Sequence, residues 1–265
     1  MSDQPHLLTE RRGHVLLVTM NRPEAKNALS SEMLARMYDA WVELSEDPEL
    51  RVGILTGAGG TFCSGMDLKA FATGFQETEW TKRFQEDDDL HWKALLRHYR
   101  PTKPLIAAVE GYCYAGGMEI LQAFDLRVAG EGAKLGITEV QRSLFPMGGS
   151  TVRLPRQIPW AIAMEMLITG EPITGQRAYD IGLVGHVVPD GTTVERAREL
   201  AQRIAANGPL AVKAIKASVL AADALPEVDA YQRESELGME VMASNDAREG
   251  PRAFLEKRTP NYTGT

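Results

Sequence analysis

The sequence has little cysteine, no excess of positive charge and no long apolar run, and each absence argues against a class of protein. Cys63 and Cys113, its two cysteines, form no C-x-x-C motif and no Cys/His cluster, which argues against a metal site. The formal net charge of −7 is opposite in sign to that of a typical nucleic-acid-binding protein. The longest apolar runs, such as Pro104–Val109, are far too short to span a bilayer. We therefore expect no metal, no nucleic acid and no membrane as partners, and two buried, reduced thiols.

The composition is that of an ordinary globular protein. Hydrophobic residues make up 44% of the 265 residues and charged residues 25%, which argues against disorder. The first 14 residues lack the apolar core of a signal peptide, so we expect a cytoplasmic location. Acidity alone does not exclude an anionic ligand, because a few local cations can bind one.

Short apolar strands alternate with helices in the first two-thirds of the chain, which is typical of an α/β fold with parallel crossovers. The helix expected at Ser31–Ser45 follows Ser30, and its apolar residues recur at helical spacing. A second helix is expected at Gly116–Phe124. The expected strands are His14–Met20, Val52–Thr56, Leu105–Val109 and Leu126–Ala129.

The last third of the chain is different, because it consists of helices. They are expected at Val194–Ala206, Leu210–Ala222, Pro226–Met242 and Asp246–Glu256. We therefore divide the chain into a core, residues 1–190, and a helical C-terminal region, residues 191–265, that packs on the core or on a neighbouring subunit. The acidic segment Glu77–Leu90 is expected to be a solvated helix or a flexible flap, since adjacent carboxylates on a helix cannot converge on one ion.

Three glycine-containing loops each follow an apolar segment and lead toward a helix. They are Phe62–Leu68, Glu110–Glu119 and Phe145–Ser150. Glycine lets the backbone approach a ligand closely, and the first N–H groups of a helix have no internal partner. Two such donors from different loops could stabilise an oxygen that gains negative charge. Each loop by itself could equally be a tight strand-to-helix turn.

The loops belong to an ordered set of motifs that resembles the crotonase (enoyl-CoA hydratase/isomerase) family. Each motif is weak alone, but their order along almost the whole chain is highly specific. The matching segments are Asn21–Pro23 with Asn27–Leu29, Phe62–Leu68, Lys103–Glu119, Leu135–Gly149 with Arg153-Leu154, Gly170–Gly182 and Ala253–Lys257.

The resemblance implies a fold, an assembly and a substrate. The fold is a crotonase-like spiral of ββα units with a helical C-terminal region that mediates trimerisation. The assembly is a homotrimer or a hexamer built from two trimers. The substrate is an acyl-CoA thioester, so coenzyme A enters as part of the substrate and no separate cofactor is expected.

The resemblance also implies the residues of the site. The catalytic carboxylates correspond to Glu119 and Glu139, and the backbone N–H groups of Met66 and Gly116 correspond to an oxyanion hole. Residues that would bind substrate or CoA are Met66, Asp67, Leu68, Lys69, Gly116 and Lys257, the last often from a neighbouring subunit. Arg22 and Lys26 are weaker candidates. His91, His98 and His186 match no motif and are expected to be structural or exposed.

These residues suit the hydration of an α,β-unsaturated thioester. Glu119 would take the proton of the attacking water and Glu139 would protonate Cα, although the two roles could be shared or exchanged. Two close carboxyls would also raise one pKa and keep a proton available at neutral pH. Taken singly, Glu119 could merely complement a helix dipole and Glu139 could be a surface acid.

Several residues depart from the family pattern and leave the acyl specificity open. Ala115 stands where a glycine is common, Met66 replaces a small residue, and Tyr112–Tyr114 is an unusual lining. The expected activity is enoyl-CoA hydratase. Alternatives are an enoyl-CoA isomerase, a carnitinyl-CoA-type dehydratase, a hydratase for a bulky acyl chain, and a non-catalytic binding module, which the two glutamates and the acidic composition disfavour.

Overall fold

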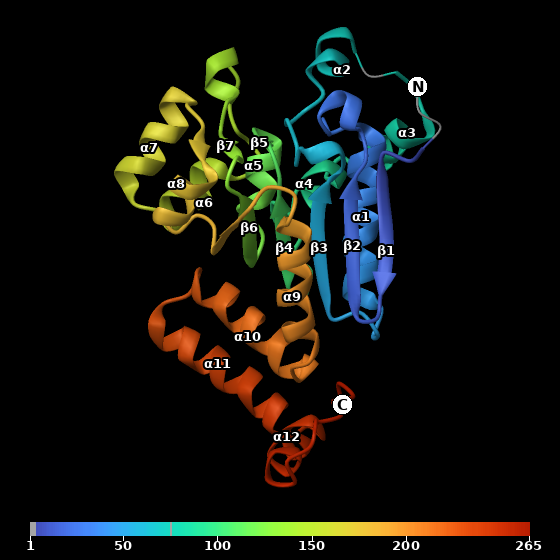
Figure 1. Ribbon diagram of the computed structural model, residues 1–265, viewed down its shortest axis with the longest axis vertical. Coiled ribbons are helices and arrows are strands. Elements are labelled where there is room, and N and C mark those ends of the chain that lie inside the picture. Colours follow the sequence, from blue (N-terminus) through green and yellow to red (C-terminus); the bar gives the residue numbers. More distant parts are fainter. Residues whose placement is uncertain (1–3, 75) are drawn as a thin grey trace.

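The computed structural model describes residues 4–74 and 76–265 (Figure 1). Its main element is a six-stranded sheet with the order β1-β2-β3-β4-β6-β9. β1 pairs antiparallel with β2, and the four pairings from β2 to β9 are parallel, as the alternating pattern predicted. The strands are β1 (Leu7–Arg12), β2 (Val15–Met20), β3 (Val52–Gly57), β4 (Leu105–Val109), β6 (Leu126–Gly130) and β9 (His186–Val188).

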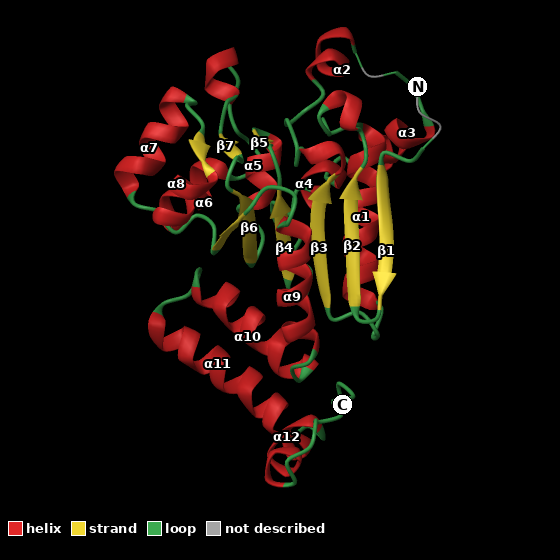
Figure 2. Ribbon diagram, viewed as in Figure 1, coloured by secondary structure: helices red, strands yellow, loops and turns green. Residues whose placement is uncertain are grey.

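The central strands β2, β3 and β4 are buried on both faces of the sheet because they are almost entirely apolar, whereas the edge strand β1 is largely exposed. Alternate residues of the strands belong to two separate cores: Leu16 and Val18 of β2 to one, Val15 and Leu17 to the other. Helix α1 (Ser31–Glu46) packs in the first core, and α9 (Thr193–Ala205) packs in the second through Ala197, Leu200 and Ala201. The sheet therefore lies between α1 and α9 (Figure 2).

Helix α1 forms where its pattern predicted. Ser30 caps it by accepting a hydrogen bond from the N–H of Met33, which satisfies one of the unpaired donors of the first turn. Its buried face includes Trp41, whose indole N–H donates to the carbonyl of Ala94 at 2.9 Å. The helix ends at Glu46, just before Asp47-Pro48, as expected.

A second, three-stranded sheet with the order β5-β7-β8 lies beside the first. Its strands are β5 (Tyr112–Tyr114), β7 (Lys134–Gly136) and β8 (Ile173–Thr174). β4, β5 and α5 (Gly116–Leu121) form one ββα turn, with a strand in each sheet followed by a helix, and β6 and β7 begin the next. The backbone of Cys63 forms an isolated parallel β-bridge with that of Cys113 in β5. The side chains of both residues are buried free thiols, as predicted.

The remaining helices surround these two sheets or extend away from them. They are α2 (Leu68–Thr73), α3 (Glu79–Glu86), α4 (Leu90–Ala94), α6 (Ser150–Gln157), α7 (Trp160–Thr169), α8 (Gly175–Asp180), α10 (Pro209–Ala222), α11 (Glu227–Met242) and α12 (Asp246–Leu255). Residues 191–265 thus contain α9–α12, of which α9 packs on the sheet. α10–α12 extend along the longest axis, away from the core (Figure 1). The acidic segment forms the exposed helix α3, and beyond it Asp87 pairs with Lys93 at 2.7 Å.

Among the described residues, no single helix is both long and apolar enough to cross a membrane. α9 and α10 reach the required length and composition only when taken together, and the chain bends by 107° between them. The first three residues, part of the segment searched for a signal peptide, lie outside the described residues.

Candidate active site

Glu119 reaches the site from the first turn of α5. The chain leaves β5, turns at Ala115 and enters the helix at Gly116, so the side chain of Glu119 lies close to the helix N-terminus. Only 5% of Glu119 is exposed. The carboxyl therefore lies inside the protein and not in bulk solvent.

The loop before α6 surrounds the Glu119 carboxyl closely. The backbone N–H of Ser150 donates to Oε1 of Glu119 at 3.4 Å. A Cβ built on Gly148 would lie only 2.5 Å from Oε2, so a residue with a side chain would displace the carboxyl. Burial and the neighbouring charge of Glu139 raise the pKa of Glu119 to about 7, although the N–H groups of Ser150 and Gly148 oppose this shift.

Glu139 enters the site from a different element. It is the first residue of the short 3-10 helix η3 (Glu139–Arg142), which follows β7. Its Oε2 is buried, and no residue of the described chain gives it a hydrogen bond. Burial raises the pKa of this carboxyl as well. The structure thus brings buried Glu119 and half-buried Glu139, which are 20 positions apart in sequence, close enough for the charge of one to act on the other.

The two predicted oxyanion donors also come together. A Cβ built on Gly65 would lie 3.3 Å from the nitrogen of Gly116, and one built on Gly116 would lie 4.0 Å from the nitrogen of Met66. Leu29 pairs with Met66, but that bridge uses the carbonyl of Gly65 and the N–H of Asp67. Within residues 4–74 and 76–265, the N–H groups of Met66 and Gly116 have no acceptor.

Ala115 holds an unusual backbone conformation at the start of α5. Its φ of 50° and ψ of −123° lie in a region that favours glycine. Glycine is the residue common at this position in the family that the sequence motifs resemble. Such strain costs about 1–3 kcal/mol and persists only where the surrounding structure enforces it. Here the N–H of Ala115 donates to the carbonyl of Gly136 at 3.0 Å, which ties the turn to β7.

The segment predicted to bind CoA forms the start of α2. Asp67 caps this helix by accepting from the N–H of Ala70, and it also pairs with Arg22 at 3.1 Å. Its carboxylate therefore shapes the loop that presents the Met66 N–H. The side chains of Leu68 and Lys69 are exposed on the first turn of α2, and the weaker candidate Lys26 lies 5.0 Å from the ring centre of Tyr112.

Lys257 does not join the other predicted residues within one chain. It is an exposed residue just after α12, at the far end of the longest axis from α2 and α5 (Figure 1). A single copy of the chain therefore leaves this residue away from Glu119 and Glu139. Its predicted contact with CoA requires a neighbouring subunit.

Sequence reasoning gave no role to several residues that shape the site. The loop Phe145–Ser150 was recognised, but not the contacts that Gly148 and Ser150 make with Glu119. Arg153, one turn further on, was noted only as part of a motif, although it lies near the same carboxyl. The sequence signal that could have revealed these contacts is the pair of successive glycines, Gly148 and Gly149, before a helix. Such a pair indicates that other side chains pack closely against the loop.

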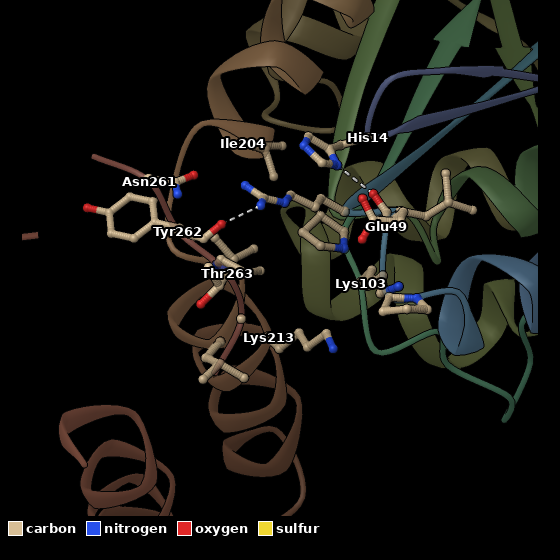
Figure 3. Close-up of a pocket in the computed structure, with 16 residues that line it drawn as sticks. His14, Glu49, Lys103, Ile204, Lys213, Asn261, Tyr262 and Thr263 are labelled. Carbon is tan, nitrogen blue, oxygen red and sulfur yellow. Dashed lines mark hydrogen bonds between the residues drawn. The ribbon is translucent and has the colours of Figure 1, made fainter. Parts of the chain in front are cut away.

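A cavity of about 400 Å³ lies at the opposite end of the parallel strands (Figure 3). Its walls include His14, Arg51 and Lys103, which precede β2, β3 and β4, whereas Glu119 and Glu139 follow the carboxyl ends of β4 and β6. The cavity therefore does not contain the predicted acids. In the part of the chain that the structure describes, no group of three or more His, Cys, Asp or Glu side chains is arranged to hold a metal ion.

Known proteins resemble this chain over nearly its whole length. A sequence model described as Enoyl-CoA hydratase/isomerase matches residues 10–265. The enoyl-CoA hydratase EchA19 of Mycobacterium tuberculosis is 55% identical over 258 residues, which cover 97% of this chain and 96% of that protein. The carnitinyl-CoA dehydratase of Proteus mirabilis is 38% identical over 274 residues, covering 100% of both. The crystal structure of an enoyl-CoA hydratase from M. tuberculosis H37Rv has a TM-score of 0.90 and 43% identity, covering 99% of this chain and 100% of that one.

Proposed function

The chain belongs to the enoyl-CoA hydratase/isomerase family, and we propose that it adds water syn to a trans-2-enoyl-CoA thioester to give a 3-hydroxyacyl-CoA. The predicted family and α/β fold are confirmed by the family match and the structural likeness. The reaction itself is our proposal. It rests on one observation above all: buried Glu119 and half-buried Glu139 both have raised pKa values, and two backbone N–H groups, one of them at the start of the helix that carries Glu119, have no acceptor in the described chain.

In this reaction the water oxygen bonds to Cβ while the double-bond electrons move toward Cα and the thioester oxygen. Negative charge develops on that oxygen, and the N–H groups of Met66 and Gly116 stabilise it. Losing one such donor typically costs about 3–4 kcal/mol in the transition state. Met66 suits this role despite its size, because its side chain is half exposed and only its backbone is used.

The two carboxyls supply the proton transfers. Glu119 accepts the proton that the water loses, and Glu139 donates a proton to Cα. A pKa of about 7 for Glu119 leaves both its protonated and its ionised form populated at neutral pH, and burial raises the pKa of Glu139 in the same direction. The roles of the two acids can also be exchanged.

A carnitinyl-CoA-type dehydration is a second candidate, supported by the full-length likeness to a carnitinyl-CoA dehydratase. The same two acids would act in reverse, removing a proton from Cα and protonating the leaving hydroxyl. An isomerase would need a single carboxyl to move a proton, so a second buried acid favours the reactions that add or remove water.

The assembly that we propose is a homotrimer or a hexamer. α10–α12 leave large apolar side chains uncovered, among them Val228, Met239 and Phe254, which are 79%, 71% and 82% exposed. A second copy that covered these side chains could bring its Lys257 to the CoA of its neighbour. A cytoplasmic location and the lack of a separate cofactor stay predictions.

Turnover of a thioester panel tests the proposed function. Wild-type protein is expected to hydrate crotonyl-CoA or a longer enoyl-CoA, seen as loss of the enone absorbance. Glu139→Gln is expected to lower the rate by about 10²–10⁴-fold, because a neutral amide cannot transfer the proton. The exposed Glu171→Gln serves as the matched control and should keep the wild-type rate.

Two results would reject this assignment. Wild-type turnover by Glu139→Gln, with unchanged circular dichroism and CoA binding, would remove Glu139 from the mechanism. Loss of water only from 3-hydroxyacyl or carnitinyl thioesters, with no hydration of any enoyl-CoA in the panel, would favour the dehydratase.

A further inference from the structure

Two backbone carbonyls hold the guanidinium of Arg153 close to the candidate active site. It lies on α6, and one guanidinium nitrogen donates to the carbonyl of Arg97 at 2.8 Å and to that of Leu96. Its other terminal nitrogen, Nη1, is buried and has no hydrogen-bond partner among the described residues. A buried guanidinium donor without a partner is unusual, because leaving it unsatisfied costs free energy.

The guanidinium and the Glu119 carboxyl lie against the same glycine pair. A Cβ on Gly148 would lie 2.5 Å from Oε2 of Glu119, and a Cβ on Gly149 would lie 3.3 Å from Nη1 of Arg153. The two groups therefore lie near each other, although no direct ion pair joins them in the described chain. Side chains at these positions would push one group or the other away.

Charged groups from several elements act on this pair. Glu139 on η3 faces Glu119, while Arg97, Arg100 and Arg127 surround Arg153. Burial, together with these arginines, lowers the pKa of Arg153 to about 10, which still leaves it protonated at neutral pH. Arg100 and Arg127 donate to backbone carbonyls of Ala123 and Leu183, so they are held by other parts of the fold.

We propose that Arg153 is a positioning residue, which packs against the Gly148-Gly149 loop around Glu119 and places a fixed positive charge near its carboxyl. This inference rests on the proposed function only in assigning Glu119 to catalysis. Because the guanidinium forms no ion pair with Glu119 in the described chain, it partly balances the charge of the carboxylate without binding its oxygens.

Titration of Glu119 in Arg153 variants tests this proposal without requiring turnover. The carboxyl carbon of Glu119 is followed by ¹³C NMR across pH and assigned by its absence in Glu119→Gln. Arg153→Gln is expected to raise the Glu119 midpoint, because removing a nearby positive charge raises the pKa of a carboxyl. Arg153→Lys, which keeps the charge, should stay near wild type. Arg156→Gln, on the exposed face of the same helix, should change nothing.

The acidic limb of kcat/KM against pH should shift upward with the NMR midpoint in Arg153→Gln. An unchanged midpoint in a folded Arg153→Gln protein would overturn the proposal, as would an equal shift in Arg153→Lys. Should Arg153→Gln fail to fold, Arg153→Met supplies a second neutral side chain of similar length for the same comparison. A shifted midpoint in a protein that hydrates no thioester would reject the proposed function but retain the effect of Arg153 on Glu119.

Discussion

The candidate active site and the C-terminal helices shift the pKa values of their acidic side chains in opposite directions. Glu119 is buried and Glu139 beside it is half-buried, and the pKa values of both are raised. Glu249 at the other end of the molecule pairs with Arg258, and the hydrogen bonds from that arginine lower its pKa to about 2. Near neutral pH Glu119, with a pKa of about 7, exists in both protonated and ionised forms, whereas Glu249 is a permanent anion. Only the first can transfer protons under ordinary conditions.

The two regions also differ in how they cover apolar side chains. The core under the site is closed, and residues such as Phe62 and Met118 are fully buried. Phe254 and Leu255 on α12 are 82% and 79% exposed. A patch of this kind on a well-formed helix indicates a surface that another protein chain covers. The comparison thus separates the region proposed to carry out chemistry from the region proposed to contact a neighbouring subunit.

Among substitutions that change neither acid, the largest effect is expected from Gly65→Ala, which disturbs the site through the backbone. The added Cβ would lie 2.6 Å from that of Ala115 and 3.3 Å from the Gly116 nitrogen, at a φ of 96° that disfavours alanine. The N–H groups of Met66 and Gly116 should move apart, and the rate should fall by about 10²–10³-fold, as on losing an oxyanion donor.

Steady-state hydration of crotonyl-CoA measures this loss. Gly74→Ala is the control, because its φ is also positive, at 85°, but a Cβ there would meet no atom within 4 Å. Equal rates for Gly65→Ala and wild type would show that these amides do not contact the thioester oxygen.

A smaller effect is expected from Phe254→Asp, which tests the other side of the comparison. Burying a phenylalanine contributes about 2–3 kcal/mol, so replacing it with a charge should weaken association about 30-fold or more. Light scattering coupled to size exclusion should show a shift from trimer or hexamer toward monomer. Leu8→Asp on the edge strand β1 is the control and should leave the mass unchanged. A monomeric wild-type protein would contradict the proposed assembly.

The sequence predicted the parts of this comparison that depend on local pattern. α1 and β4 lie almost where their apolar spacing placed them, because each buries a continuous face. β1 was missed, because five of its six residues are exposed and its sequence LLTERR lacks an apolar run. β5 and β7 were missed because three-residue strands are too short to show a periodicity.

Only those residues of the candidate site that lie in family motifs could be predicted from the sequence. The motifs identified Glu119, Glu139 and both amide donors, but they could not indicate that the loop before α6 encloses Glu119. That contact joins residues 31 positions apart, and it depends on how α5 and α6 pack. The charge of Arg153 near the same carboxyl is likewise a property of tertiary packing.

The most direct test of the account is the stability of Glu119→Gln as a function of pH. The central claim is that Glu119 is buried without an ion pair that would neutralise its charge. The unfolded chain ionises Glu119 near 4.5 and the folded protein near 7, so ionisation favours unfolding. This destabilisation is absent below pH 4.5, grows between the two values and is complete above pH 7.

Urea unfolding at a fixed protein concentration measures the difference in free energy between the variant and the wild type. The account predicts that Glu119→Gln is more stable than wild type by about 3 kcal/mol at pH 8, and that this advantage shrinks toward pH 5. A variant that is less stable than wild type at pH 8, or whose difference does not depend on pH, would contradict the claim.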